Sequence, residues 1–189
     1  LEFDGDGTLI TTRQCLLNPN RNPGLTEAQV EGVLKQTFGV RKVLWIDEGL
    51  VADHTDGHID NIVRFARPGV VICQAPSGED DPQTAVLSSI ARQLSRMTDA
   101  KGRRLKVYTI PSPGRVDLGD GEIVPASHMN WVIGPRNVVV PTYGTASAAA
   151  AVAALRPLFP HHTVVGSSAR AILSGGGAFH CVTCHQPGV

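Results

Sequence analysis

The sequence of 189 residues has little of what marks several specialised classes of protein. Four cysteines are too few for a disulfide scaffold of this size, so a reducing cytoplasm is the expected compartment. The formal net charge is zero, and no basic stripe favours a nucleic-acid partner. The longest apolar run, ASAAAAVAAL, is too short to span a bilayer. A hydrophobic content of 42% and a charged content of 18% are typical of a globular chain.

The chain repeats a pattern of strand, helix and strand. Short β-branched runs, each entered through a Gly or Asn turn, occur at 7–12, 69–74 and 137–142. The periodicity predicts a helix after each run, at 25–39, 80–97 and 145–159, and then a second strand, at 42–46, 105–110 and 163–166. Thr26 and Gln29 have the spacing of a capping box. Two further strands, 61–68 and 129–135, form hairpins with the runs that follow them.

This repeat predicts one domain, residues 1–189, of mixed α/β modules; the alternative is an ordinary α/β sandwich whose segments are similar by accident. Two polar, glycine-containing segments follow equivalent strands: 53–61 comes after 42–46, and 174–181 comes after 163–166. If the modules are arranged around an axis, equivalent loops converge there and His58 meets Cys181. A Cys–His pair of this kind is a candidate for nucleophilic catalysis.

The segment Asp53–Asp60 also carries carboxylates beside its histidines. His58 and Asp60 are two positions apart, so in an extended chain their side chains point to the same side. Asp60 could then hold the tautomer of the imidazole, or accept two hydrogen bonds from a planar guanidinium. The alternative is a solvated polar loop without a role in chemistry.

The sequence C-V-T-C-H at 181–185 is open to four interpretations. Covalent haem needs an apolar cage and a second axial ligand, and zinc needs a second ligand pair, for which His54 and His58 have the spacing but are interleaved with aspartates. A redox dithiol belongs at a helix N-terminus. The fourth interpretation is one reactive thiolate, Cys181, in a glycine-led apolar strand. Gly175–Gly177 would let the backbone approach a ligand closely.

Four segments then point to a known family: CLLNPNRNPGLT, TDGHIDNIVRFARPGVV, PASHMNWVIGPRNVVVPTYG and GGGAFHCVT. They resemble successive motifs of the agmatine deiminases, which belong with bacterial peptidylarginine deiminases in the guanidine-modifying superfamily. The resemblance runs from about Leu1 to Gly188. It implies the pentein fold, a five-bladed α/β propeller, with about three blades in this sequence. We therefore expect an N-terminally incomplete catalytic domain, with a second substrate-binding carboxylate outside it.

The resemblance also implies a reaction and its residues. Cys181 would attack the guanidinium carbon, His58 would protonate the departing ammonia and then activate water, and Asp60 would bind the guanidinium nitrogens. Asp56 and Gly177 are expected to line the substrate site. Agmatine would give N-carbamoylputrescine, on the way to putrescine, through a thiouronium intermediate. No metal or cofactor is expected. The expected partner is a small cationic guanidino substrate, without nucleic acid or membrane; the oligomeric state is open, a homo-oligomer included.

Three positions depart from the family pattern and bear on substrate preference. Cys184 and His185 stand where polar amides are usual, Thr145 stands where an acidic residue is common, and His128 replaces an aromatic residue. The alternatives are a deiminase of peptidyl or free arginine, which gives citrulline, and a non-catalytic pentein remnant.

An arginine-specific site would need a cation for the substrate's α-carboxylate. The candidates are Arg64, Arg67 and Arg136.

Overall fold

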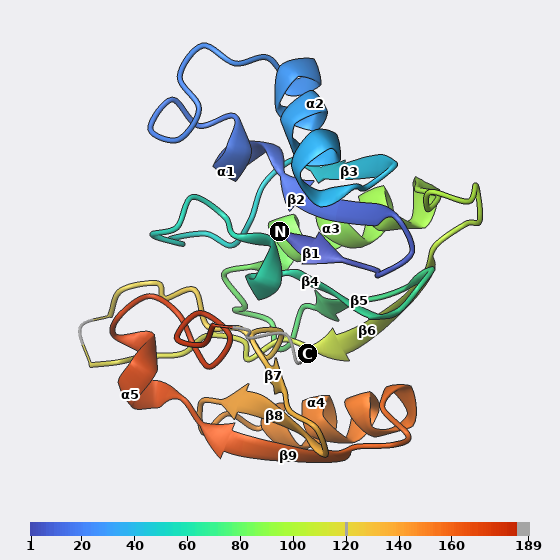
Figure 1. Cartoon of the computed structure of the whole chain (residues 1–189). Coiled ribbons are helices and arrows are strands. Elements are labelled where there is room, and N and C mark those ends of the chain that lie inside the picture. The colour runs from blue at the N-terminus through green and yellow to red at the C-terminus, as the bar shows by residue number, and fades with distance from the viewer. Residues whose placement is uncertain (120, 185–189) are drawn as a thin grey trace.

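The strands form three separate three-stranded sheets with the same internal order (Figure 1). The computed structural model describes residues 1–119 and 121–184. The sheets consist of β1 (Glu2–Phe3), β2 (Thr8–Thr12) and β3 (Lys42–Ile46); of β4 (Val63–Arg67), β5 (Val70–Ala75) and β6 (Lys106–Pro111); and of β7 (Val132–Ile133), β8 (Asn137–Thr142) and β9 (Thr163–Ser168). In each sheet the first two strands pair antiparallel, and the third strand runs parallel to the second. We call each unit a module, numbered one to three along the chain.

One longer helix connects the two parallel strands of each module, as the repeat predicts. These helices are α2 (Glu27–Phe38), α3 (Thr84–Arg96) and α4 (Ala148–Leu155). Shorter helical segments are α1 (Arg13–Leu16), η1 (Ile59–Asn61), η2 (Arg156–Leu158) and α5 (Arg170–Leu173). The capping box of Thr26 and Gln29 is confirmed, and Gly39 ends α2 in the left-handed conformation that a C-cap favours. No helix in the described parts of the chain is long and apolar enough to cross a membrane.

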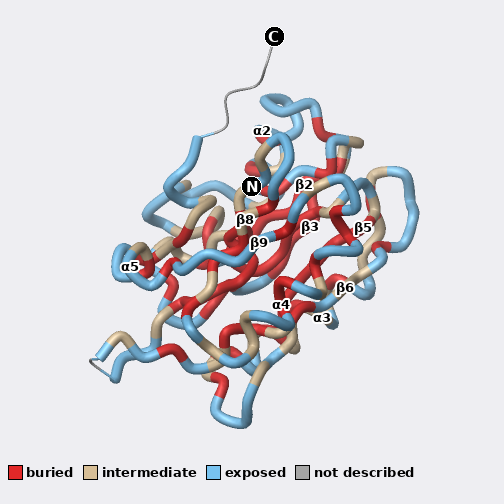
Figure 2. The backbone as a smooth tube through the Cα atoms, turned by 90° about the horizontal axis from the view of Figure 1, so that it is seen from below, coloured by how far each residue is buried: buried red, intermediate tan, exposed pale blue. Residues whose placement is uncertain are grey.

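Two of the helices pack between neighbouring modules. Helix α3 contacts β5 and β6 of its own sheet and also β3 of module one, and α4 likewise contacts β9 and β6. Leu87, Ile90 and Leu94 are fully buried on α3, while the predicted core positions Val86 and Met97 are only partly buried at the edge of the same cluster. Figure 2 shows the buried trace running through the strands and exposed loops around them, while the connecting segment 125–131 before β7 is itself buried.

A buried arginine joins all three modules. The guanidinium of Arg64 on β4 donates through Nε to Glu2 Oε2 at 2.9 Å, and through Nη1 to the carbonyl of Trp131 at 2.9 Å. Glu2 Oε1 accepts from the backbone N–H of Phe65 at 2.9 Å. Arg64 is only 4% exposed, so breaking this network would leave a buried charge without its partner. Its contacts fix β1, β4 and the segment before β7 relative to one another.

Three local predictions were wrong, and one hairpin was missed. The stretch before β4 is the 3-10 helix η1, so His58 and Asp60 do not lie on an extended chain. The predicted strand 129–135 shortens to Val132–Ile133, because the groups of residues 129–131 bond to Arg64 and to the loop after β9 instead of to a neighbouring strand. Cys181 lies in a turn and not in a strand. Module one also has a hairpin, β1–β2, which the sequence pattern did not reveal.

Candidate active site

Three equivalent loops, one from each module, build the site. They follow β3, β6 and β9, and they leave the sheets on the same side of the molecule, at the left of Figure 1. The loop after β3 carries Asp60, the loop after β6 carries Asn130, and the loop after β9 carries Cys181. Cys181 Sγ lies 3.5 Å from Asp60 Oδ2, although 121 positions separate the two residues. The predicted convergence of equivalent loops is therefore confirmed.

Asp60 is a buried carboxylate with a partner from each of the other two segments. Its Oδ2 accepts from Asn130 Nδ2 at 3.0 Å and from His180 Nδ1 at 2.6 Å. Burial opposes ionisation of this carboxyl, but the hydrogen bond and charge of His180 outweigh it, with help from Arg64 and His58, and lower the pKa of Asp60 to about 2. Asp60 is therefore ionised at neutral pH and can bind a cation.

The Cys181 thiol lies against both Asp60 and Asn130. Its Sγ is 3.1 Å from Asn130 Nδ2, and its backbone N–H donates to Asn130 Oδ1 at 3.2 Å. Partial burial and the Asp60 carboxylate raise the pKa of Cys181, while a backbone contact with Ala178 and the Asn130 amide act in the opposite direction. A Cβ on Gly177 would lie 3.0 Å from the sulfur, so the thiol occupies space that only glycine leaves open.

His58 is half-buried at the start of η1, on a loop that is fixed at several points. Thr12 Oγ1 donates to the carbonyl of Gly57 at 2.7 Å, and Gly57 packs against the backbone of Gly49. Burial lowers the pKa of His58, against the Asp60 carboxylate, which raises it. Among the described residues no hydrogen bond joins His58 to Cys181, so the predicted direct Cys–His contact is not found here. His58 is two positions before Asp60 in the chain and is coupled to it by charge.

Asp56 contacts a cation and not the thiol. Its carboxylate lies 3.7 Å from Arg21 Nε, and its backbone has a positive φ of 60°. The Arg21 guanidinium also donates to the carbonyl of Thr55 at 2.9 Å. The predicted substrate-binding role of Asp56 would require this ion pair to open, whereas Gly177 lies directly against Cys181.

Two residues of this cluster, Asn130 and His180, were missed. Both lie inside motifs that the sequence analysis quoted, but no role was given to them. The repeat carried a signal for Asn130: if the loops after β3 and β9 converge, the loop after β6 must converge with them. His180 had no comparable signal, because its bond to Asp60 spans 120 positions and depends on the turn that holds it.

The remaining sequence candidates are placed as follows. His128 is fully buried, with Nδ1 2.7 Å from the carbonyl of Pro141 and its ring 5.8 Å from that of Tyr143, so it fills a core position beneath the site. Thr145 contacts Ser147 just before α4. Cys184 is exposed, and His185 lies outside the described residues.

Across residues 1–119 and 121–184, no group of three or more His, Cys, Asp or Glu side chains could hold a metal ion.

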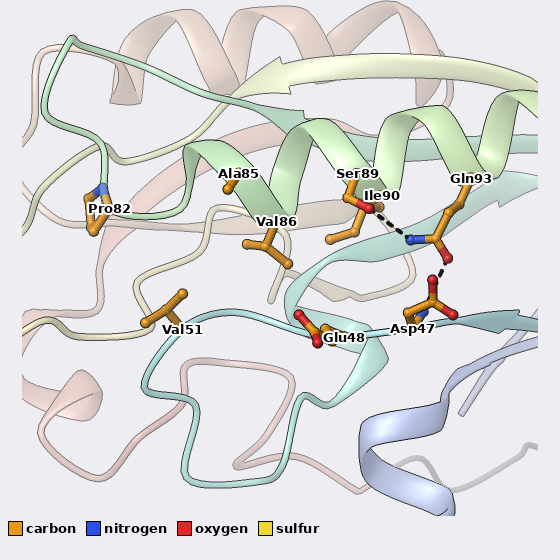
Figure 3. Close-up of a pocket in the computed structure, with 9 residues that line it drawn as sticks. All are labelled: Asp47, Glu48, Val51, Pro82, Ala85, Val86, Ser89, Ile90 and Gln93. Atoms are coloured by element: carbon orange, nitrogen blue, oxygen red, sulfur yellow. Dashed lines mark hydrogen bonds between the residues drawn. The ribbon is translucent and has the colours of Figure 1, made fainter.

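A separate groove runs between α3 and the loop after β3 (Figure 3). It has a volume of about 360 Å³ and is lined by Asp47, Glu48, Val51, Pro82, Ala85, Val86, Ser89, Ile90 and Gln93. Gln93 bridges its two sides, because its amide accepts from the backbone N–H of Asp47 at 3.1 Å and donates to Ser89 at 3.2 Å. Cys181, His58 and Asp60 do not line this groove, which makes it distinct from the candidate site.

Comparison with known proteins identifies the family. The model of the Porphyromonas-type peptidyl-arginine deiminases matches residues 1–187. The chain belongs to this family. Its repeated α/β modules are accordingly those of the pentein-type propeller, while the blade number of five remains a prediction.

Individual members of the deiminase family cover almost the whole chain. The chain is 38% identical over 203 residues to a Marinomonas protein named "Putative agmatine deiminase". The alignment covers 99% of this chain and 55% of the relative. The agmatine deiminase structure of Enterococcus faecalis matches with a TM-score of 0.88 at 34% identity, over 94% of this chain and 53% of that one. A substrate-bound agmatine deiminase of C. jejuni matches with a TM-score of 0.85 at 27% identity, over 95% and 52%. The chain thus spans about half the length of its relatives.

Proposed function

We propose that the complete protein hydrolyses agmatine to N-carbamoylputrescine and ammonia. The observation that carries this proposal is the contact of a thiol, Cys181, with an ionised buried carboxylate, Asp60, at the meeting point of loops from different modules. A carboxylate beside a nucleophile suits a cationic substrate, since it binds the cation and holds its central carbon near the sulfur. The family membership supports the same chemistry.

The contacts of Asp60 suggest how a guanidinium would bind. Every hydrogen bond that the described residues make to this carboxylate goes to Oδ2. Oδ1 is therefore available for a substrate N–H. A guanidinium has several donors in one plane, and each donor that is buried unpaired costs about 1–3 kcal/mol. The second carboxylate expected outside this chain would satisfy the others.

The reaction would proceed in two halves through the thiolate of Cys181. The sulfur attacks the guanidinium carbon and forms a C–S bond. His58 gives a proton to one terminal nitrogen, which leaves as ammonia when its C–N bond breaks, so that a thiouronium remains on Cys181. His58 then takes a proton from water, whose oxygen attacks the same carbon. The C–S bond then breaks and the added hydroxyl loses its proton to solvent, so that its oxygen becomes the carbonyl of the ureido product and the thiolate is restored.

Electrostatics favour activation of the thiol by the substrate itself. In the free site partial burial and the Asp60 carboxylate raise the pKa of Cys181, which keeps the sulfur protonated and weakly reactive. A guanidinium bound at Asp60 offsets that negative charge and brings a positive charge to the sulfur, so it lowers the same pKa. The nucleophile is then formed where a cationic substrate is already in place.

The placement of the three candidate arginines, Arg64, Arg67 and Arg136, favours agmatine over arginine. Arg64 is buried and bonded to Glu2 and to backbone carbonyls, so it does not offer a cation to an α-carboxylate. Arg67 and Arg136 are exposed at the hairpin turns of modules two and three, away from the loops that build the site. Agmatine has no α-carboxylate and needs no such cation.

The test is ammonia release by the complete protein from agmatine, free arginine and a peptidyl-arginine analogue. We expect turnover with agmatine, loss of turnover in Cys181→Ser, and retention of most turnover in Cys184→Ser. A haloacetamidine, which mimics the guanidinium, should leave its adduct on Cys181 in mass spectrometry. Higher kcat/KM with an arginine substrate would assign the alternative reaction. No ammonia from any of the three substrates would favour the non-catalytic alternative, and an adduct only on Cys184 would overturn the assignment of the nucleophile.

A further inference from the structure

Asn130 lies at the centre of the cluster, on the loop of module two and between Asp60 on the loop of module one and Cys181 on the loop of module three. The residue is fully buried, in the segment that connects β6 to β7. Its backbone carbonyl accepts from the N–H of His180 at 3.1 Å. It is therefore attached to the turn that carries Cys181 by its main chain as well as by its side chain.

The hydrogen bonds fix the orientation of the Asn130 amide. Oδ1 accepts from the backbone N–H of Cys181, a group that can only donate. The amide nitrogen must therefore face the other way, where it lies 3.1 Å from Cys181 Sγ, 3.0 Å from Asp60 Oδ2 and 2.9 Å from Asn61 Oδ1. Its two hydrogens are shared among three acceptors, and two of these are the reacting groups of the site.

This arrangement reduces the electrostatic repulsion between the Cys181 thiolate and the Asp60 carboxylate. A thiolate at Cys181 would stand beside the Asp60 carboxylate, and like charges at this separation repel each other. Asn130 is the side chain that donates to both sulfur and carboxylate among the described residues. A hydrogen bond to a charged acceptor is stronger than one to a neutral acceptor, so the amide favours the ionised form of each.

We propose that Asn130 is a positioning residue that stabilises the Cys181 thiolate and holds it beside Asp60. This role rests on the proposed function as far as turnover is concerned, but its effect on the thiol is independent of any substrate. Without the amide, the thiolate would form only at higher pH. A site without Asn130 should therefore be slow at neutral pH and should recover as the pH rises.

Alkylation of the complete protein by iodoacetamide tests the role directly. The rate of modification of Cys181 is followed by mass spectrometry from pH 6 to pH 11 in the wild type, Asn130→Ala and Asn130→Asp. In Asn130→Ala the midpoint of the alkylation rate against pH should rise by about one pH unit. The rate should be about tenfold lower than in the wild type at pH 7 and equal to it above the shifted midpoint. Asn130→Asp, which replaces the donor by a charge, should shift the midpoint further.

Ser127→Ala is the matched control. Ser127 is buried in the same segment and bonds to Asn61 and Met129, without a described contact to Cys181 or Asp60. This variant should keep the wild-type midpoint. An unshifted midpoint in Asn130→Ala would overturn the proposal, and so would loss of folding in both Asn130 variants while Ser127→Ala folds, since that would assign Asn130 a structural role.

Turnover separates this proposal from the proposed function. The kcat/KM for agmatine in Asn130→Ala should show the same recovery at high pH as the alkylation rate. If the wild type releases no ammonia, the proposed function fails, yet the alkylation profile still decides the role of Asn130. If turnover is normal and the alkylation midpoint does not move, only the role of Asn130 fails.

Discussion

An alanine at position 177 would test how closely the loop after α5 holds Cys181, the proposed nucleophile. A Cβ there would lie 2.9 Å from Cys181 Cβ and 3.0 Å from Sγ, whereas carbon atoms in contact normally stand about 3.5–4.0 Å apart. The backbone of Gly177 is outside the left-handed region, so alanine fits its conformation. The change should therefore displace the Cys181 side chain by about 0.5 Å or more and leave the fold intact.

Such a displacement is large for a nucleophile. It would lengthen or misalign the contact of 3.1 Å between Cys181 Sγ and Asn130 Nδ2 and so weaken it. Because a misplacement of about 1 Å can cost about a hundredfold in rate, we expect kcat for agmatine to fall by about 10- to 100-fold in Gly177→Ala. The free energy of unfolding should stay within about 1 kcal/mol of the wild type, since no other contact is lost.

The neighbouring glycines supply matched controls. In Gly175→Ala the new Cβ would meet only the carbonyl of Ile172 at 3.3 Å, so both activity and stability should be largely kept. Gly176 has a φ of 87° and its Cβ would lie 3.1 Å from the His54 ring, so Gly176→Ala should lose about 1 kcal/mol of stability or more. Ammonia release from agmatine and urea unfolding of the three complete proteins measure both properties.

Two outcomes would contradict the argument that Gly177 positions Cys181. If Gly177→Ala turns over agmatine within about twofold of Gly175→Ala, the packing of Gly177 against Cys181 does not set the position of the thiol. A loss of activity that follows a loss of stability across all three variants would likewise contradict the argument.

Three further predictions concern single side chains. Arg64→Leu should lower the free energy of unfolding, measured in urea, by about 3–5 kcal/mol because it leaves the buried Glu2 carboxylate without its partner. A loss below about 1 kcal/mol would contradict the inter-module role of Arg64. His58→Ala should lower kcat by about 10² to 10⁴ through lost proton transfer, while the exposed His161→Ala should not; equal rates would remove His58 from the mechanism. The pKa of Asp60 is lowered to about 2 in the folded state, so its ionisation contributes about 2 kcal/mol above pH 4, and this is lost as the pH falls towards 2. The stability difference between wild type and Asp60→Asn should shrink over that window in urea unfolding, and a constant difference would show that the pKa is not lowered.

The local structure could largely be predicted from the sequence because its causes are local. The β-branched runs became β2, β5 and β8, and the antiparallel turn at Pro68 and Gly69 follows from residue types that favour turns. The convergence of the loops followed from the repeat. One failure involves a contact that no local pattern contains, because Asn130 bonds across 51 positions to Cys181. The other is local: a 3-10 turn at Asp60 replaced the predicted extended chain.

The geometry of the candidate site could be predicted least well, because it depends on how side chains from separate loops fit together. The position of Cys181 relative to Asp60 depends on Asn130, which contacts both, and on Gly177, which lies against Cys181. None of these determinants is visible as a spacing in the sequence, although each of the residues concerned lies inside a motif.

The three-loop construction of the site divides its chemistry among modules that are alike in their strand order. The loop after module one carries the Asp60 carboxylate, the loop after module two carries the Asn130 amide, and the loop after module three carries the Cys181 thiol. No module carries the complete set. The strands and helices can therefore remain an unchanged frame while each loop varies in length and content. For protein engineering this means that substrate choice should be addressed by exchanging one loop at a time. A transplanted module, however well it folds, would bring only part of an active site with it.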